Sequence, residues 1–166
     1  MTITAIPNGT FIGCDALVSY NVPSFITAIG AEAFKNCKNL SAITFEAGEA
    51  DLIIGKQAFY GCSAISALNL PSRLVSIGAE AMVGSSISSI TFTDKDVGGV
   101  NESSRLAEIG RRAFASAKIE NIVLPEGLKH IGARAFEYSS LKTVVIPSSV
   151  SNEGNRLGME ADDDNR

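Results

Sequence analysis

The chain has 166 residues and a mass of 17.4 kDa, which is the size of a single domain. Hydrophobic residues make up 45% and charged residues 19% of the sequence, a balance that is typical of folded globular proteins and excludes wholesale disorder. The net charge of −4, without a basic cluster, argues against nucleic acid as a partner. No apolar run approaches the roughly 20 residues needed to cross a membrane, so we expect no membrane insertion.

A sixfold repeat organises the first 147 residues. In each unit an isoleucine stands five residues before an aromatic position, and glycine follows this isoleucine in every unit except the first, which has Pro7. The aromatic position holds Phe11, Phe34, Phe59, Met82, Phe114 and Phe136. Units recur every 22 to 25 residues, except for a spacing of 32 between the fourth and the fifth. A fixed period of this length predicts a solenoid of stacked coils.

Each unit ends with three large apolar residues in the spacing L-x-x-L-x-L. These triplets are Leu17/Tyr20/Val22, Leu40/Ile43/Phe45, Ile65/Leu68/Leu70, Ile87/Ile90/Phe92, Ile119/Ile122/Leu124 and Leu141/Val144/Ile146. The alternation at the end of each triplet predicts a short, half-buried strand. A unit of this length has no room for a crossover helix, so we expect the strands of successive coils to pair in one parallel sheet. The aromatic positions should then stack into a column inside the core.

The combined pattern I-G-x-x-A-F-x-x-C-x-x-L-x-x-I resembles the BspA-type leucine-rich repeat, also called the Treponema pallidum class. The second unit carries it in Ile29-Gly30, Ala33-Phe34, Cys37, Leu40 and Ile43, and the resemblance extends over residues 3–147. It implies a leucine-rich-repeat solenoid of about six coils of 22–25 residues. Short parallel strands would line a concave face, with turns and short strand or 3-10 segments on the convex side. Members are commonly surface or secreted proteins that act in adhesion, and as a class they carry no catalytic residues.

The repeats also set the domain boundaries. We expect a solenoid over residues 1–147, with an inserted loop at about residues 93–105 between the fourth and fifth units. The insertion is charged and rich in glycine, so it should be exposed to solvent, as should the acidic segment 46–51. Residues 148–166 form a polar, acidic tail that we expect to be disordered.

The outward positions of the triplet strands are the candidate binding residues. The central row consists of Asn21, Thr44, Asn69, Thr91, Val123 and Val145, and a neighbouring row adds Ser89, Asn121 and Thr143. Most of these residues are small and uncharged with a hydroxyl or amide group, so they could pack against an extended partner with little cost of desolvation. The alternative interpretation is that small and β-branched residues simply suit strand positions.

No residue pattern predicts an enzyme, a metal site or a cofactor. The single histidine, His130, lacks the nucleophile and the orienting partner that a general base requires. The three cysteines form no C-x-x-C pair, and they occupy a slot that serine and alanine fill in the later units. Stacked coils would bring Cys14 and Cys37 close together, which leaves open a disulfide between them.

The leading functional hypothesis is a non-catalytic protein-interaction module that recognises a host or cell-surface protein through the concave strand face. The alternative is an intracellular leucine-rich-repeat scaffold or regulatory protein. We expect a cell-surface or secreted location if the chain is part of a longer protein. If the chain is complete we expect a cytoplasmic location, because its first residues do not form a signal peptide. The first coil has no polar cap, so end-to-end self-association through the terminal coils is a further expectation.

Overall fold

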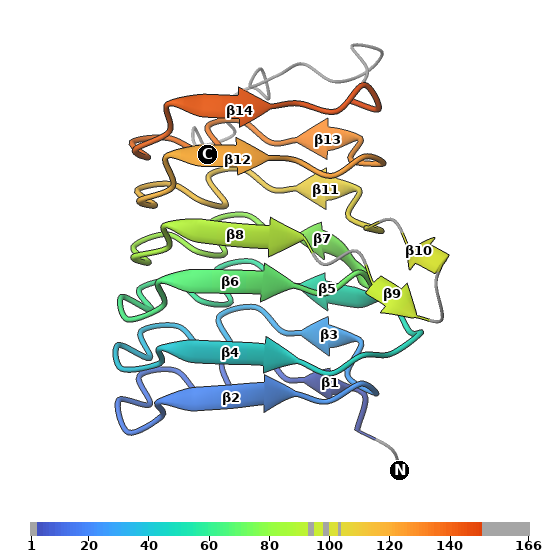
Figure 1. Ribbon diagram of the computed structural model, residues 1–166. Coiled ribbons are helices and arrows are strands. Elements are labelled where there is room, and N and C mark those ends of the chain that lie inside the picture. Colours follow the sequence, from blue (N-terminus) through green and yellow to red (C-terminus); the bar gives the residue numbers. More distant parts are fainter. Residues whose placement is uncertain (1–2, 93–94, 98–99, 103, 151–166) are drawn as a thin grey trace, which may run out of the picture.

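The computed structural model describes residues 3–92, 95–97, 100–102 and 104–150, which form a stack of coils along one axis (Figure 1). Each coil contributes one short strand to each of two opposite sides, and tight turns join the two strands. None of these residues is in a helix or a 3-10 segment, so of the two alternatives expected for the second side, short strands or 3-10 segments, the structure has short strands joined by turns. The solenoid predicted from the repeat is confirmed.

The residues before each glycine, or before Pro7 in the first coil, form one continuous parallel sheet, which we call the glycine-side sheet. The isoleucines are in register from coil to coil, with Ile6 opposite Ile29 and Ile29 opposite Ile54. The strands pair in chain order as β1 (Ala5–Ile6), β3 (Ala28–Ile29), β5 (Leu52–Ile54), β7 (Leu74–Ile77), β11 (Glu108–Ile109) and β13 (His130–Ile131).

The triplet residues form the strands of the opposite side, but these strands do not build the single sheet that we expected. They are β2 (Ser19–Val22), β4 (Ala42–Phe45), β6 (Ala67–Leu70), β8 (Ser89–Phe92), β12 (Asn121–Val123) and β14 (Thr143–Val145). In the described residues they pair two by two, as β2–β4, β6–β8 and β12–β14. The breaks follow β4 and β8, after which the chain carries its extra residues. We attribute each break to this added length, which shifts the next strand relative to the previous one.

Close approach of neighbouring coils explains the glycine of each repeat. A β-carbon on Gly78 would lie 2.6 Å from the backbone nitrogen of Lys56, and one on Gly110 would lie 2.6 Å from that of Ala79. Either contact is a collision with the preceding coil. The repeat glycine itself is not left-handed; a left-handed residue stands two positions after it in each of these coils, at Glu32, Gln57, Glu80, Arg112 and Arg134.

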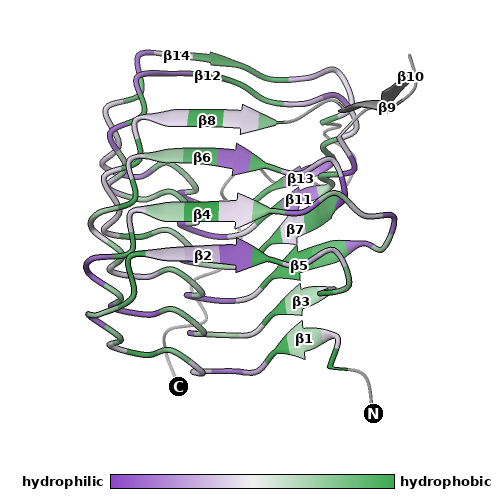
Figure 2. Ribbon diagram, turned by 60° about the horizontal axis from the view of Figure 1, so that its bottom comes forward, coloured by the Kyte–Doolittle hydropathy of each residue, from purple (hydrophilic) through white to green (hydrophobic). Residues whose placement is uncertain are grey.

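The core consists of apolar columns that run through the stack. The rings of Phe34 and Phe59 are stacked with 5.1 Å between their centroids, and Phe11 lies 5.0 Å from Phe34. Phe114 and Phe136 are stacked at 5.5 Å, and the buried Met82 holds the equivalent position in the fourth coil. Burial alternates along β2 and β6, so every second residue turns toward the core, and each of these strands carries a hydrophilic stretch next to its hydrophobic end (Figure 2). The predicted aromatic column is confirmed.

The insertion differs from the loop that we expected, because two strands form within it. β9 (Lys95–Val97) pairs with β10 (Val100–Glu102) in an antiparallel hairpin at the side of the stack (Figure 1). Two glycines separate these strands in the sequence, a common signal for a tight hairpin turn. Residues 93–94, 98–99 and 103 and the tail from residue 151 onward lie outside the described residues. Most of the tail that we expected to be disordered, residues 148–166, therefore lies outside them as well.

Candidate binding surface

The outward surface of the triplet strands, which we call the triplet face, carries all nine residues predicted to bind a partner. Each of the nine is exposed to solvent, as the alternation along the strands indicated. Strand pairing places Asn21 opposite Thr44 and Asn69 opposite Thr91. Their exposure is established, whereas their role in binding stays a prediction.

Three threonines on the triplet face each donate a hydrogen bond to an asparagine of the preceding coil. The Oγ1–Oδ1 distances are 2.9 Å for Thr44–Asn21, 2.5 Å for Thr91–Asn69 and 2.5 Å for Thr143–Asn121. Since each hydroxyl proton is used on the amide oxygen, the amide nitrogen is left to donate elsewhere. The triplet face therefore presents oriented hydrogen-bond donors.

In the first of these pairs the amide nitrogen holds a carboxylate. Asn21 Nδ2 donates to Glu46 Oε1 at 2.8 Å, and the backbone N–H of Ser24 donates to Glu46 Oε2 at 3.0 Å. The backbone N–H of Glu46 also donates to the carbonyl of Val22, at 2.9 Å. Glu46 thus extends the strand ladder while two donors hold its side chain. The sequence identifies segment 46–51 only as an exposed acidic stretch and gives no sign of this contact.

A hollow opens at each break between the triplet strands. The first has a volume of about 250 Å³ and is lined by residues that include Thr44, Phe45, Asn69, Ser72 and Arg73. The second has a volume of about 610 Å³ and is lined by residues that include Ile90, Thr91, Phe92, Asn121 and Val123. Five of the nine predicted binding residues therefore line a hollow, and the half-buried side chains of Ile90 and Phe92 offer apolar surface there.

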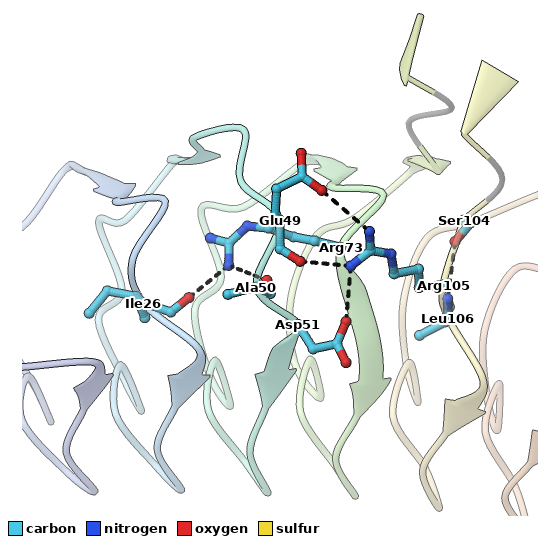
Figure 3. A network of polar contacts seen from close by, with 8 residues as sticks. All are labelled: Ile26, Glu49, Ala50, Asp51, Arg73, Ser104, Arg105 and Leu106. Carbon is cyan, nitrogen blue, oxygen red and sulfur yellow. Dashed lines mark hydrogen bonds and ion pairs between the residues drawn. The ribbon is translucent and has the colours of Figure 1, made fainter. Parts of the chain in front are cut away.

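A buried arginine holds the backbone beside the first hollow (Figure 3). The side chain of Arg73 is 1% exposed, and its guanidinium donates to the carbonyls of Ile26 at 2.7 Å, Pro23 at 3.2 Å and Ala50 at 3.3 Å. Burial lowers the pKa of this guanidinium, and the negative charge of Glu46 opposes that shift. In the described part of the chain Arg73 forms no ion pair, so its bonding partners are backbone carbonyls of earlier coils.

A second arginine holds the acidic segment from the outside (Figure 3). Arg105 donates to the carbonyl of Glu49 at 2.8 Å and forms an ion pair with Asp51 at 3.1 Å. This side chain is 38% exposed, and it connects the end of the insertion to a coil more than fifty residues earlier in the chain. The sequence placed Arg105 at the end of the loop but gave no sign of this contact.

All three cysteines are free thiols, so the disulfide left open between Cys14 and Cys37 is not formed. Cys37 Sγ donates to the carbonyl of Phe11 at 2.9 Å, and Cys62 Sγ donates to that of Phe34 at 3.0 Å. Burial raises the pKa of the Cys37 thiol and raises that of the Cys62 thiol to about 12. Both thiols therefore act as protonated donors that join one coil to the coil before it.

The described residues contain no cluster of side chains that suggests a metal site. Among them, no three His, Cys, Asp or Glu side chains lie close enough together to hold a metal ion. His130 is half-buried in β13, on the side of the stack opposite the triplet strands (Figure 1).

The stacked coils, the parallel strands and the columns of buried apolar residues define a leucine-rich-repeat solenoid. Six copies of the BspA type leucine rich repeat region match residues 1–104 and 52–157. The chain belongs to this family, and the resemblance seen in the sequence is confirmed. No curated protein sequence shows a significant match to the chain. Within the described ranges, no helix is long and apolar enough to span a membrane.

Several solved structures share the fold. The Treponema pallidum leucine-rich repeat protein is 25% identical over 89% of this chain and 65% of its own, with a TM-score of 0.66. A leucine-rich cell surface protein from Faecalibacterium prausnitzii is 23% identical over 90% of this chain and 44% of its own, with a TM-score of 0.58. A leucine-rich repeat protein from Eubacterium ventriosum is 23% identical over 82% and 27%, with a TM-score of 0.53. The chain thus spans less than two thirds of the length of each of these proteins.

Proposed function

We propose that this chain is a non-catalytic protein-interaction module that binds an extended segment of a partner protein across the triplet face. The observation that carries the proposal is the row of exposed asparagines whose amides are oriented by threonines of the next coil. An extended segment can satisfy such donors with its own carbonyl and side-chain oxygens. Membership of a leucine-rich-repeat family supports the proposal, since these repeats generally serve in protein interactions.

The two hollows supply pockets for apolar side chains of the partner, which the polar asparagine rows lack. Affinity at protein interfaces usually depends on a few apolar anchors that fill pockets. Phe92 and Ile90 line the second hollow next to Thr91 and Asn121, so an apolar side chain of the partner can be buried beside the polar row. The second hollow, with its volume of about 610 Å³, is the better candidate for such an anchor.

Adhesion to a host or cell-surface protein is the finer form of this proposal. The cell surface protein from Faecalibacterium prausnitzii, which shares the fold, supports this setting. An intracellular scaffold would use the same face, but no observation favours that alternative. In either setting the same residues would contact the partner.

A peptide selection followed by mutagenesis tests the proposal. Peptides would be selected on the purified chain from a random library, and their affinities measured for a variant with Thr91→Lys and Val123→Lys. We expect these substitutions, which place two cations beside the second hollow, to weaken binding at least tenfold. The matched control is Ile53→Lys in β5 of the glycine-side sheet, where the side chain is 47% exposed. Selected peptides that lose affinity only for the Ile53→Lys variant would overturn the proposal.

A further inference from the structure

The break between β8 and β12 leaves the edge of β12 without a neighbouring strand. The carbonyl of Glu120 accepts a hydrogen bond from the N–H of Thr143 at 3.2 Å, so Glu120 bonds to the last coil. Because alternate residues of a parallel strand bond to opposite sides, the backbone groups of Asn121 and Val123 face β8. Within the described part of the chain these two N–H groups and two carbonyls have no hydrogen-bond partner.

The facing edge of β8 is unpaired in the same way. In β4 the N–H of Glu46 donates back to the carbonyl of Val22 at 2.9 Å, so the backbone of Phe45 faces forward along the stack. β8 pairs with β6 in the register in which β4 pairs with β2, so Ile90 and Phe92 turn their backbone groups toward the break. No described residue bonds to them there.

The second break is also wider than the first. The N–H of Lys118 donates to the carbonyl of Ile87 at 2.8 Å, so the fourth and fifth coils touch just before these strands begin. Beyond that contact β8 and β12 are more widely spaced than the other neighbouring triplet strands (Figure 1), and the hollow of about 610 Å³ opens there. At the first break β4 and β6 stay closer together, and the hollow has a volume of about 250 Å³.

Apolar side chains at the second break lack the cover that they have one coil earlier. Leu68 and Leu70 in β6 are each 1% exposed, whereas Ile90 and Phe92, their partners in β8, are only half-buried. The difference follows from the position of β12, which does not close over β8. Both side chains line the hollow, so a further apolar side chain placed there would bury them.

Neither edge carries a feature that blocks strand pairing. Proteins commonly protect exposed strand edges with proline or with charged side chains. β8 has the sequence Ser-Ile-Thr-Phe and β12 the sequence Asn-Ile-Val, so both lack such residues. The two edges are therefore open to an added strand.

We infer that an extended segment of the partner protein lies between β8 and β12 as an added strand. Its backbone pairs with Ile90 and Phe92 on one side and with Asn121 and Val123 on the other, and we call these four the edge residues. Every second side chain of the segment points into the hollow, so its sequence has the pattern apolar-x-apolar. The inference rests on the proposed function, and it adds that the segment runs alongside the strands and is held by its backbone.

Hydrogen exchange measured by nuclear magnetic resonance tests this site. The probe is the acetylated and amidated peptide Ser-Ala-Ile-Thr-Phe-Glu, the sequence of residues 41–46, which combines the apolar-x-apolar pattern with a charge for solubility. We expect the probe to slow exchange at the amides of the four edge residues about tenfold or more, because each amide gains an acceptor. The amides of Ile43 and Ala67, which face the first break, are the internal control and should not change.

A modified probe separates backbone pairing from side-chain contact. Methylation of the backbone nitrogens of its isoleucine and threonine removes one donor toward each neighbouring strand and keeps every side chain. We expect the methylated peptide to bind at least tenfold more weakly than the unmodified one. Equal protection by the methylated peptide, or no protection by the unmodified one, would overturn the inference.

Two proline variants locate the added strand. Val123→Pro removes an N–H that faces the second break, and Ala67→Pro removes one that faces the first. We expect Val123→Pro to weaken binding of the probe at least tenfold and Ala67→Pro to leave it unchanged, and the reverse result would overturn the inference. If selected peptides bind the triplet face and depend on Thr91 and Val123, but tolerate backbone methylation, the added strand is refuted and the proposed function stands.

Discussion

Two buried cysteine thiols join neighbouring coils of the stack through hydrogen bonds. Cys37 and Cys62 each donate to a carbonyl of the preceding coil, which requires the thiol to carry its proton. In the later units serine or alanine fills the same slot, and Ser85 is buried there as well. The sequence correctly predicted a small residue at this position. It did not predict the hydrogen bond, because that depends on which carbonyl of the neighbouring coil lies opposite.

The pKa of Cys62 leads to a prediction for stability at alkaline pH. The folded state raises this pKa from its ordinary value of 9.0 to about 12, so it holds the thiol proton more tightly than the unfolded chain does. The contribution to stability is complete below pH 9 and is lost as the pH rises toward 12. Relative to a Cys62→Ser variant, whose hydroxyl does not titrate, the native chain should lose at most about 1.4 kcal/mol per pH unit in this range.

Thermal unfolding followed by circular dichroism between pH 8 and pH 11 measures this difference. The Cys14→Ser variant, altered at a cysteine that is only half-buried, is the control and should show the alkaline slope of the native chain. Parallel slopes for the native chain and the Cys62→Ser variant would show that the thiol does not contribute.

At the scale of the strand and its loop, two arginines hold neighbouring parts of the same turn in different ways. Arg73 is buried and serves three carbonyls, so Arg73→Met should leave these acceptors without a donor and cost about 2–4 kcal/mol of unfolding free energy. Arg105→Met removes a surface ion pair and should cost about 1 kcal/mol or less. Urea unfolding of both variants measures the contrast, and a larger loss for Arg105→Met would contradict the buried network.

The aromatic column gives a second prediction at this scale. Phe59 is fully buried between coils, so Phe59→Ala should cost about 3–5 kcal/mol through the cavity that it leaves. Phe11 is only half-buried in the first coil, and Phe11→Ala should cost clearly less because solvent already reaches that position. Urea unfolding again provides the measurement. Equal losses at the two positions would contradict a column that is tightest in its middle.

The repeat made these elements predictable, and departures from the repeat limited the prediction. The isoleucine, the aromatic position and the triplet recur in every coil, so their strands and columns follow from the sequence pattern alone. The breaks after β4 and β8 and the contact of Glu46 with Asn21 arise where extra residues enter. At those places the geometry depends on how one coil sits on the next, which no residue pattern within a single coil specifies. The exposed rows of the triplet face were predictable, but the hollows between them were not.

At the scale of the whole molecule, the hydrogen bonds between the turns of neighbouring coils all run in one direction, from an N–H group of one coil to a carbonyl of the next. Backbone N–H groups at the aromatic position donate to the following coil, as Phe11 does to Ala33 at 2.7 Å and Phe114 does to Ala135 at 2.8 Å. In the last coil the N–H of Phe136 has no acceptor among the described residues. A second copy placed head to tail would offer its first coil to these donors, which is the form of self-association that the open end coils suggested.

Pro7 opposes such head-to-tail stacking. It occupies the position where the other coils have glycine, and at Gly30 a β-carbon would lie 2.6 Å from the backbone nitrogen of Asn8. Gly30 also donates its N–H to the carbonyl of Ile6, a bond that proline cannot make. The first coil therefore cannot receive the last coil of a second copy at the spacing used inside the stack.

The final prediction is that Pro7→Gly increases self-association and that Pro7→Ala does not. Glycine restores both the N–H and the space, whereas alanine restores the N–H but keeps a β-carbon that collides with an incoming coil. Sedimentation velocity over a range of protein concentrations measures the effect, and the Pro7→Gly variant should sediment as larger species at concentrations where the native chain does not. If the Pro7→Ala variant associates as strongly, the cause is a loosened first coil, and the steric explanation is wrong.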